Sequence, residues 1–293
     1  MVVGTEMSSP YVSQMALGDT VVTLIAYMRN WRWQYRSNSV SAEDVREATP
    51  EADADGKVRL DFVIAHISTG GHSVVVDPGG VTEDYRVAQP EADFTPGLEA
   101  GLSSVGLTLA GVTHVLVTHP HGDHFRGVSQ SEHGAALTFP NAKHVVSRLD
   151  WEDETPESAM LRAAMAQAAG SGQIEVVEPD LELLPGLTLM HTPGETSGHF
   201  CVRVASQGRA FYWLGDLVHH RLELRHLDWV LPWGDSTLAA ASRRRVMGEA
   251  ADTNAIVVWA HAPFPGWGIL SRDGEGFGWS TVGVGKVRDP AFD

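Results

Sequence analysis

The run HPHGDH, from His119 to His124, constrains this chain more than any other feature of its sequence. It places three histidines and an aspartate within six positions, directly after the β-branched run Val112 to Thr118, which predicts a buried strand. Imidazole nitrogens and carboxylate oxygens are the ligands that zinc prefers where no thiolate is offered. On a turn that leaves a strand, the first two histidines can share one metal while Asp123 and His124 turn toward a second. The run therefore predicts a metal site at the C-terminal end of a strand, the edge of layered α/β folds where ligands usually collect.

The overall composition limits the classes of protein that fit. The chain has 293 residues, of which 43% are hydrophobic, so it can bury a core as one large domain or two small ones. Its net charge of −16 repels nucleic acid and anionic membranes. Because Cys201 is the one cysteine, an intrachain disulfide and a cysteine-based zinc finger are excluded. The apolar stretch Val21 to Tyr27 is too short to span a bilayer, and the first ten residues lack the pattern of a secretory leader. A cytoplasmic protein without nucleic-acid or membrane partners is expected.

Short apolar and β-branched runs separated by turn residues predict the secondary structure. Strands are expected at residues 20–27, 60–67, 73–76, 112–118, 174–177, 187–191, 201–205 and 210–214, with a last buried strand at 255–260. Helices are expected after Thr95-Pro96, at 157–169 after Thr155-Pro156, and from a capping Ser236 to about residue 251. Residues 1–19 are interpreted as a flexible arm. Strands followed by helices in each half favour two sheets packed face to face with helices outside.

Three further ligand-type residues stand just past predicted strands: His199, Asp216 and His261. A polar residue in such a place can simply cap the strand. In the same way, Asp77 can be only the first residue of an Asp-Pro-Gly turn. The shared position of these residues at strand ends makes them candidates for the site that the HPHGDH run begins.

The stretch THPHGDHFRG, from Thr118 to Gly127, resembles the signature of the metallo-β-lactamase superfamily. Asp77 upstream and the pairs Gly198-His199, Gly215-Asp216 and Ala260-His261 downstream follow in the order of that family, over a region from about residue 20 to residue 279. The resemblance implies a four-layer αβ/βα sandwich, with two mixed β-sheets inside and helices outside. It also implies a single domain over residues 1–293 and a site along one edge of the sheets.

The resemblance also implies which residues bind metal. The first metal would be bound by His119, His121 and His199, and the second by Asp123, His124 and His261, with Asp216 bridging both. Two divalent ions are expected, with zinc favoured and manganese, cobalt or iron as alternatives. Asp77 would orient one of the ligand histidines. Asp123 or Asp216 would take up or relay a proton during catalysis.

Within the superfamily, the sequence is most similar to the branch of N-acyl homoserine lactonases and methyl parathion hydrolase. The similarity lies in residues 139–147, 215–220 and 261–268. Three positions depart from the pattern. His219 stands where the lactonases usually have a tyrosine, Arg126 where a small residue is common, and Glu195 where a histidine often precedes the metal ligand. His219 could donate a hydrogen bond to an oxyanion or leaving group, or be only a partly buried histidine. Arg126 is interpreted as an exposed loop residue rather than a carboxylate-binding one.

The chemistry expected of such a site is hydrolysis of an ester, lactone or related acyl bond in a small molecule, with a bridging hydroxide as nucleophile. Hydrolysis of phosphotriesters or phosphodiesters, a mononuclear iron dioxygenase and a metal-stabilised binding protein are the alternatives. A substrate with an apolar or aromatic part is expected, and a homodimer is compatible with the sequence.

Other tryptophans and arginines have simpler interpretations. Trp213 and Trp259 are assigned to the core, because aromatic residues at strand positions are usually buried. Trp229, Trp233 and Trp267, each flanked by proline or glycine or close to one, are candidates for a pocket wall. The segment around Trp31 and Trp33 is expected to influence substrate choice. The triplet at residues 243–245, three arginines, is interpreted as a solvated helix face.

Overall fold

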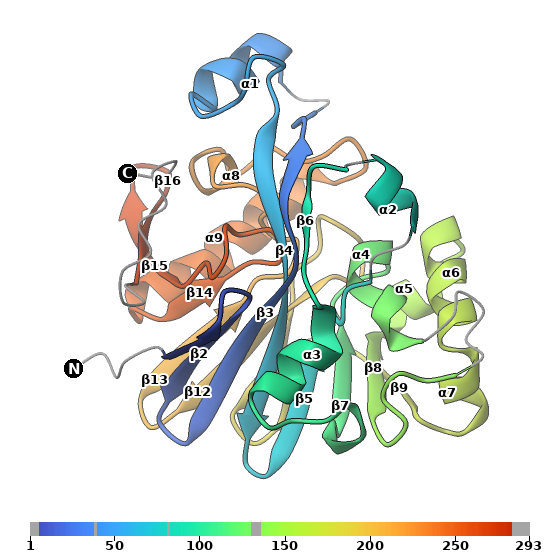
Figure 1. The fold of residues 1–293 in the computed structure, drawn as a ribbon. Helices are drawn as coiled ribbons and strands as arrows, with labels where there is room; N and C mark the ends of the chain where they lie inside the picture. The colour runs from blue at the N-terminus through green and yellow to red at the C-terminus, as the bar shows by residue number, and fades with distance from the viewer. Residues whose placement is uncertain (1–5, 38–39, 81–82, 89, 130–135, 283–293) are drawn as a thin grey trace.

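The computed structural model describes residues 6–37, 40–80, 83–88, 90–129 and 136–282, arranged as two facing β-sheets with helices on their outer sides (Figure 1). The first sheet has nine strands in the order β1-β2-β3-β4-β5-β7-β8-β9, with β6 paired to β3. Its strands are β1 (Glu6–Ser9), β2 (Val12–Leu17), β3 (Thr20–Trp33), β4 (Val58–Thr69), β5 (His72–Val76), β6 (Asp93–Phe94), β7 (His114–Val117), β8 (Lys143–Ser147) and β9 (Ile174–Val177). The second sheet has seven strands in chain order, namely β10 (Leu181–Leu184), β11 (Leu187–His191), β12 (Phe200–Ser206), β13 (Arg209–Trp213), β14 (Ile256–Val258), β15 (Gly268–Asp273) and β16 (Gly276–Thr281).

The helices lie outside the two sheets or beside the edge that carries the predicted site. They are α1 (Ala42–Ala48), α2 (Glu83–Ala88), α3 (Gly97–Ser104), α4 (Gly122–Phe125), α5 (Arg148–Trp151), α6 (Pro156–Ala164), α7 (Ala166–Gly170), α8 (Leu222–Arg225) and α9 (Ser236–Asp252). Helix α3 packs against β3 and α9 against β15, so each sheet has a helix on its outer side (Figure 1). The expected sandwich of two mixed sheets with outer helices is confirmed. Among the residues described, no helix combines the length and hydropathy needed to cross a bilayer.

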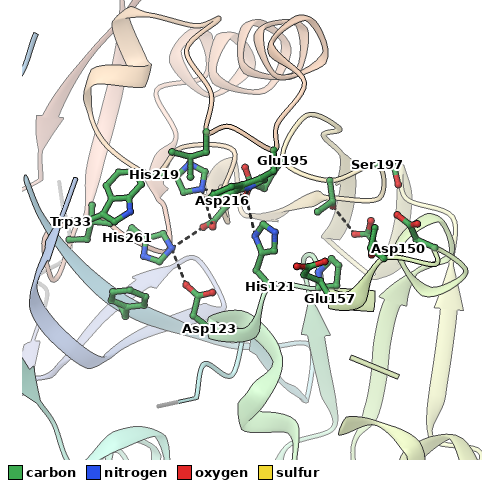
Figure 2. A pocket seen from close by; sticks show the side chains of 18 of the residues that line it. Trp33, His121, Asp123, Asp150, Glu157, Glu195, Ser197, Asp216, His219 and His261 are labelled. Atoms are coloured by element: carbon green, nitrogen blue, oxygen red, sulfur yellow. Dashed lines mark hydrogen bonds and ion pairs between the residues drawn. The ribbon is translucent and has the colours of Figure 1, made fainter. Parts of the chain in front are cut away.

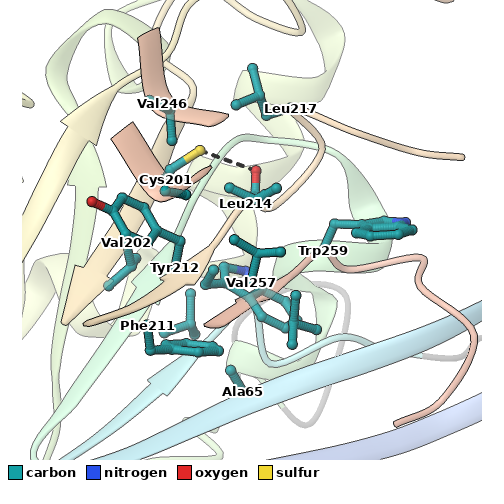
Figure 3. Packing of buried hydrophobic residues seen from close by; sticks show 14 of the residues in the cluster. Ala65, Cys201, Val202, Phe211, Tyr212, Leu214, Leu217, Val246, Val257 and Trp259 are labelled. Atoms are coloured by element: carbon teal, nitrogen blue, oxygen red, sulfur yellow. Dashed lines mark hydrogen bonds between the residues drawn. The ribbon is translucent and has the colours of Figure 1, made fainter. Parts of the chain in front are cut away.

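The main hydrophobic core lies between the sheets. Figure 3 shows part of it, where Ala65 of β4 belongs to the same buried cluster as Phe211 of β13 and Val257 of β14. Successive residues of a strand point to opposite faces, so Leu24 of β3 enters this core while Ile25 enters a second cluster on the other face. Burial on both faces explains why the first strands read as continuous apolar runs.

The one cysteine, Cys201, lies inside this core. Its thiol donates a hydrogen bond to the Leu214 carbonyl oxygen (Figure 3), and burial raises its pKa to about 12. The thiol therefore stays protonated near neutral pH and is unsuited to nucleophilic chemistry.

Parallel strands bring the predicted site residues to one edge. Strands β5, β7 and β8 run parallel in the first sheet, so Asp77 after β5 and Thr118 after β7 lie at the same end. In the second sheet β13 and β14 run parallel, which places Asp216 and His261 together beyond their C-terminal ends. Four segments that are distant in the sequence therefore meet along one edge of the sandwich.

The prediction of a flexible arm over residues 1–19 is wrong for its described part. Strand β1 pairs with β2, and β2 pairs with β3 in antiparallel register from Val12↔Ile25 to Leu17↔Thr20. Val12, Met15 and Leu17 are buried. The segment was misread because Ser13 and Gln14 interrupt its apolar pattern. Residues 1–5 lie outside the described ranges.

Boundaries in the rest of the chain also differ from expectation, beginning with β3, which continues to Trp33 instead of ending at residue 27. The predicted strand at 255–260 is only Ile256–Val258 and is not the last one, because β15 and the glycine-rich β16 follow it. The helix expected at 157–169 is interrupted at Met165, which separates α6 from α7. Helix α9 is capped by Asp235 rather than by Ser236, since the Asp235 carboxylate accepts hydrogen bonds from the backbone amides of Thr237 and Leu238.

Candidate metal centre

Two groups of metal-ligand side chains face each other in a cleft at this edge (Figure 2). Each group consists of residues whose ligand atoms all lie within 4.8 Å of one another. One is His119, His121, Glu195 and Asp216, and the other is Asp123, His124 and His261. Six of the seven predicted ligands therefore belong to these groups, together with Glu195, which was not predicted to be a ligand.

Asp77 fixes the end of β7 just before His119, the first residue of the histidine motif. Its carboxylate accepts hydrogen bonds from the Thr118 backbone amide at 2.9 Å, the Thr118 hydroxyl at 3.0 Å and the Trp213 indole at 2.9 Å. It therefore joins β7 of the first sheet to β13 of the second. Its Oδ2 atom also lies 3.2 Å from Nδ1 of His124, which is where a carboxylate that orients a ligand histidine would stand.

Asp216 lies between the two groups. Its Oδ2 atom is 3.6 Å from Nε2 of His119 and 3.2 Å from Nε2 of His124, and its Oδ1 atom is 3.3 Å from Nε2 of His261. Asp123 completes the second group, with Oδ2 at 3.5 Å from Nε2 of His261 (Figure 2). One carboxylate thus reaches ligand atoms on both sides, which is the arrangement needed to bridge two cations.

The electrostatics of the cleft favour bound positive charge. Burial would raise the pKa of the Asp216 carboxyl, but His124, His261 and His219 hold it well below its ordinary value. Burial would lower the pKa of His124, yet the carboxylates of Asp216, Asp77 and Asp123 hold it well above. Oδ1 of Asp216 and Nε2 of His124 are buried and have no hydrogen-bond partner among the described groups. Buried carboxylates and imidazoles whose polar atoms lack such partners are suited to coordinate a cation.

His199 lies beside the first group without belonging to it. Its Nε2 atom accepts a hydrogen bond from the Asp216 backbone amide at 3.1 Å, and its Nδ1 atom lies 2.8 Å from the Thr192 hydroxyl. Gly215, at φ +56°, permits this approach, because a Cβ there would be 2.8 Å from Nε2 of His199. His199 is therefore adjacent to the predicted first metal, with its ring centroid 5.2 Å from that of His119.

Glu195 is the site residue that the sequence reasoning did not assign. Its Oε1 atom lies 3.1 Å from Nδ1 of His121 and 3.6 Å from Nε2 of His219, and it accepts a hydrogen bond from the indole of Trp233 at 2.7 Å. The available signal was the acidic side chain at a position where the family often has histidine, which was noted only as a departure.

His219 is held from behind by a buried ion pair. The Glu223 carboxylate accepts a hydrogen bond from the His219 backbone amide at 2.7 Å and another from the Tyr35 hydroxyl at 3.0 Å. Arg243 pairs with Glu223 at 3.0 Å and donates to the carbonyl oxygens of Leu217, Leu227 and Trp229. The interpretation of residues 243–245 as a solvated face is therefore wrong for Arg243, which is 2% exposed.

The cleft has a volume of about 660 Å³ and is lined by both apolar and acidic side chains. Its apolar side chains are Trp31, Trp33, Leu60, Phe62, Leu231 and Trp233, and its acidic ones are Asp123, Asp150, Asp153, Glu157, Glu195 and Asp216. Trp233 and the segment around Trp31 thus line it, as expected. Trp229 and Trp267 do not, since both are buried in clusters elsewhere, as are the predicted core residues Trp213 and Trp259. Arg126 is half-buried and also lies outside the lining.

Asp150, one of the acidic residues that line the cleft, positions the loop that leads to His199. Its carboxylate accepts hydrogen bonds from the Thr196 hydroxyl and the Gly198 amide, both at 2.9 Å (Figure 2). Burial raises its pKa to about 6, against the opposing effect of these two hydrogen bonds.

This shift predicts a measurable pH dependence. Because the folded-state pKa lies above the ordinary value of 3.8, the folded protein retains a proton that the unfolded chain has lost between about pH 4 and pH 6. The contribution of Asp150 to stability should thus be greatest below pH 4 and decrease as the pH rises through 6. The free energy of unfolding of the wild type, minus that of Asp150→Asn, should therefore fall by about 2–3 kcal/mol between pH 4 and pH 7. Urea unfolding of both metal-stripped proteins across this range measures it, and a constant difference would contradict the assignment.

Comparisons with known proteins agree with this geometry. The family model of the metallo-beta-lactamase superfamily matches residues 60–261. An atrochrysone carboxyl ACP thioesterase of Claviceps purpurea (strain 20.1) is 28% identical over 137 residues, which are 46% of this chain and 33% of the relative. An N-acyl homoserine lactonase of Bacillus sp is 25% identical over 160 residues, which are 55% of this chain and 60% of the relative. The aligned regions thus span about a third and three fifths of these curated relatives.

Solved structures share the fold over nearly the whole chain. The hydrolase AbOPH of the beta lactamase superfamily has a TM-score of 0.80 at 20% identity, covering 95% of this chain and 99% of that one. AidC, described as a dizinc quorum-quenching lactonase, has a TM-score of 0.76 at 19% identity, covering 96% and 98%. Since the family model covers well over half of the sequence, and the sandwich and its histidine motif agree with it, the chain belongs to the metallo-beta-lactamase superfamily.

Proposed function

We propose that this protein is a binuclear metal-dependent hydrolase that cleaves an ester, lactone or related acyl bond of a small molecule. The observation that carries the proposal is the position of Asp216, between two groups of metal-ligand side chains in a cleft lined in part by apolar side chains. The thioesterase and lactonase names of the curated relatives point to the same bond class, acyl transfer to water.

The ligand assignment keeps the family pattern, and the two groups contain every ligand of that pattern except His199, which lies beside the first group. His119, His121 and His199 would hold the first cation and Asp123, His124 and His261 the second, with Asp216 between them. Two such cations, most readily zinc, would supply the activation of water at neutral pH and the polarisation of the substrate carbonyl. The orphaned polar atoms of His124 and Asp216 are consistent with this donor set.

The remaining chemistry falls to side chains that line the cleft. Asp123 and Asp216 offer carboxylate oxygens that can take the proton released when water is activated. Burial would lower the pKa of His219, but Glu195 and Asp216 hold it well above its ordinary value, which favours an N–H at Nε2. That N–H can donate to the oxygen on which negative charge develops, or to the leaving oxygen.

The lining favours a neutral substrate with an apolar part. Trp31, Trp33 and Phe62 form an apolar surface next to the metal-ligand groups, where an acyl chain or aryl ring can lie. Among the described residues that line the cleft, none is lysine or arginine, while several are acidic. A phosphodiester or carboxylate substrate would meet the negative charge of Asp153 and Glu157, which line the cleft but belong to neither group.

A substrate panel tests the proposal. The metal-loaded protein should hydrolyse acyl homoserine lactones or aryl esters at least tenfold faster, in kcat/KM, than organophosphate triesters and phosphodiesters. A preference for triesters would favour the organophosphate alternative, because the same centre serves both. Inertness toward all four classes, together with one iron per chain, would favour a mononuclear dioxygenase and contradict the proposal.

A further inference from the structure

The proposed ligand set, taken over from the family pattern, gives the buried Glu195 carboxylate no metal to bind, although it lies next to the ligand His121. Its side chain is 4% exposed and is directed toward the metal-ligand groups (Figure 2). A buried carboxylate costs free energy unless it is paired or coordinates a metal. We propose that Glu195 is a ligand of the first metal, alongside His119, His121 and Asp216. It takes the place that the family pattern gives to His199, whose Nε2 atom here accepts the hydrogen bond of the Asp216 backbone amide. This inference rests on the proposed binuclear site.

The spacing of the ligand atoms supports direct coordination. Oε1 of Glu195 lies 3.1 Å from Nδ1 of His121, which lies 2.9 Å from Nε2 of His119, which lies 3.6 Å from Oδ2 of Asp216. Neighbouring ligands of one tetrahedral zinc, with bonds of about 2.0–2.1 Å, lie about 3.3 Å apart. A proton on Nδ1 of His121 can form a hydrogen bond to Oε1 of Glu195 or to Nε2 of His119, but not to both. A cation placed between these atoms can accept a lone pair from each of them.

The orientation of the carboxylate is fixed by a group that does not titrate. The Trp233 indole, which can only donate, gives its hydrogen bond to the same Oε1 atom at 2.7 Å. Ligating carboxylates are commonly oriented by such an outer hydrogen bond. Although Trp233 is 58% exposed, its indole nitrogen is thus engaged in holding Glu195.

The loop that carries Glu195 is held against helix α9. Gly194, at φ +144°, lies so close to α9 that a Cβ there would be 2.5 Å from the Cα atom of Ala239. The Asp235 amide donates to the Gly194 carbonyl oxygen at 2.8 Å, and the Ser242 hydroxyl donates to the Pro193 carbonyl oxygen at 2.8 Å. Glu195 is therefore presented to the site by a segment fixed before any metal binds.

A carboxylate in this position should change metal preference. Carboxylate oxygens suit manganese, whereas imidazole suits zinc, so Glu195 should raise the affinity for Mn²⁺ relative to Zn²⁺ compared with a histidine there. It also adds a negative charge, which should strengthen binding of the first cation over one held by neutral imidazoles alone.

Metal binding to Glu195→Gln tests the inference without any substrate. Equilibrium dialysis is carried out separately against buffered Zn²⁺ and buffered Mn²⁺, with metal content measured per chain. With either metal, one of the two ions bound per chain should be held at least tenfold less tightly than in the wild type. The Co²⁺-loaded protein should show an altered visible spectrum. Glu157→Gln is the matched control, because Glu157 lines the same cleft but belongs to neither group, and it should bind both metals as the wild type does.

Glu195→His provides a second test if the glutamine variant folds poorly. It should retain Zn²⁺ but bind Mn²⁺ at least tenfold less well relative to Zn²⁺. The inference would be overturned if the variants kept the wild-type metal affinity, metal preference and Co²⁺ spectrum. It would also be overturned by a loss of turnover with unchanged metal binding, because Glu195 would then act on the substrate or on His219. Loss of a metal from Glu195→Gln, in a protein that hydrolyses no acyl substrate, would leave the inference standing and refute the proposed function instead.

Discussion

Replacement of Asp216 by asparagine should abolish turnover and release metal. Its two oxygens reach His119 on one side and His124 and His261 on the other, at 3.2 to 3.6 Å. Asparagine keeps the size of the side chain but loses the negative charge and one of the two acceptor oxygens. Both proposed metal sites should therefore lose the carboxylate that joins them. We expect kcat/KM to fall on the order of a thousandfold or more, which exceeds the effect of removing one ordinary hydrogen-bond donor from a catalytic site.

Metal content and kinetics measured on the same preparation check this prediction. Asp153→Asn is a suitable control, because Asp153 also lines the cleft but belongs to neither group, and it should keep both metals. An Asp216→Asn protein that retains two metals per chain and near-normal kcat/KM would show that Asp216 does not bridge.

Replacement of Arg243 by methionine should strongly destabilise the protein. Methionine fills much of the same space but leaves the Glu223 carboxylate, which is fully buried, without its arginine partner and with only the weaker contact to His219 at 3.5 Å. Breaking a buried pair in this way typically costs about 3–5 kcal/mol. Because Glu223 holds His219 through its backbone amide, turnover should fall as well.

Urea unfolding of the metal-stripped proteins measures the effect without the added stability from bound metal. Arg244→Met is the matched control, because Arg244 is exposed on the same helix, and it should stay within about 0.5 kcal/mol of wild type. The double variant Arg243→Met, Glu223→Gln should recover part of the loss, since it no longer buries an unpaired charge. A loss below about 1 kcal/mol for Arg243→Met alone would contradict this role.

Much of the fold was predictable because its signals are local. The apolar runs around Val63, Val75 and Val115 mark strands that are buried on both faces, and turn residues separate them. Predicted ligands such as Asp216 and His261 stand just past strand ends, where parallel pairing gathers side chains at one edge. The position of these residues in the sequence therefore carried most of the information about the candidate site.

The features that were missed depend on contacts between distant segments. Strand β2 has a weak apolar pattern of its own, and it is ordered by pairing with β3 and by a hydrogen bond from Trp267 to Ser13. Arg243 looked like a surface residue because its buried partner Glu223 lies twenty positions away on another helix. No local pattern distinguishes such residues from solvated ones.

Glu195 was overlooked for a different reason. The family pattern does not make its position a metal ligand, so the departure from histidine there points only to a difference in substrate. Its closeness to His121 arises only when the loop after β11 packs against α9 and turns toward the end of β7.

The central claim, a hydrolase whose activity depends on two bound metals, is tested most directly by removing and restoring them. Exhaustive chelation should reduce hydrolysis of the best acyl substrate to background. Addition of Zn²⁺, Mn²⁺ or Co²⁺ should restore hydrolysis in step with metal content, up to two ions per chain. Full turnover by the chelated protein with no measurable metal would contradict metal-dependent hydrolysis. Recovery of activity without any rise in bound metal would contradict it as well.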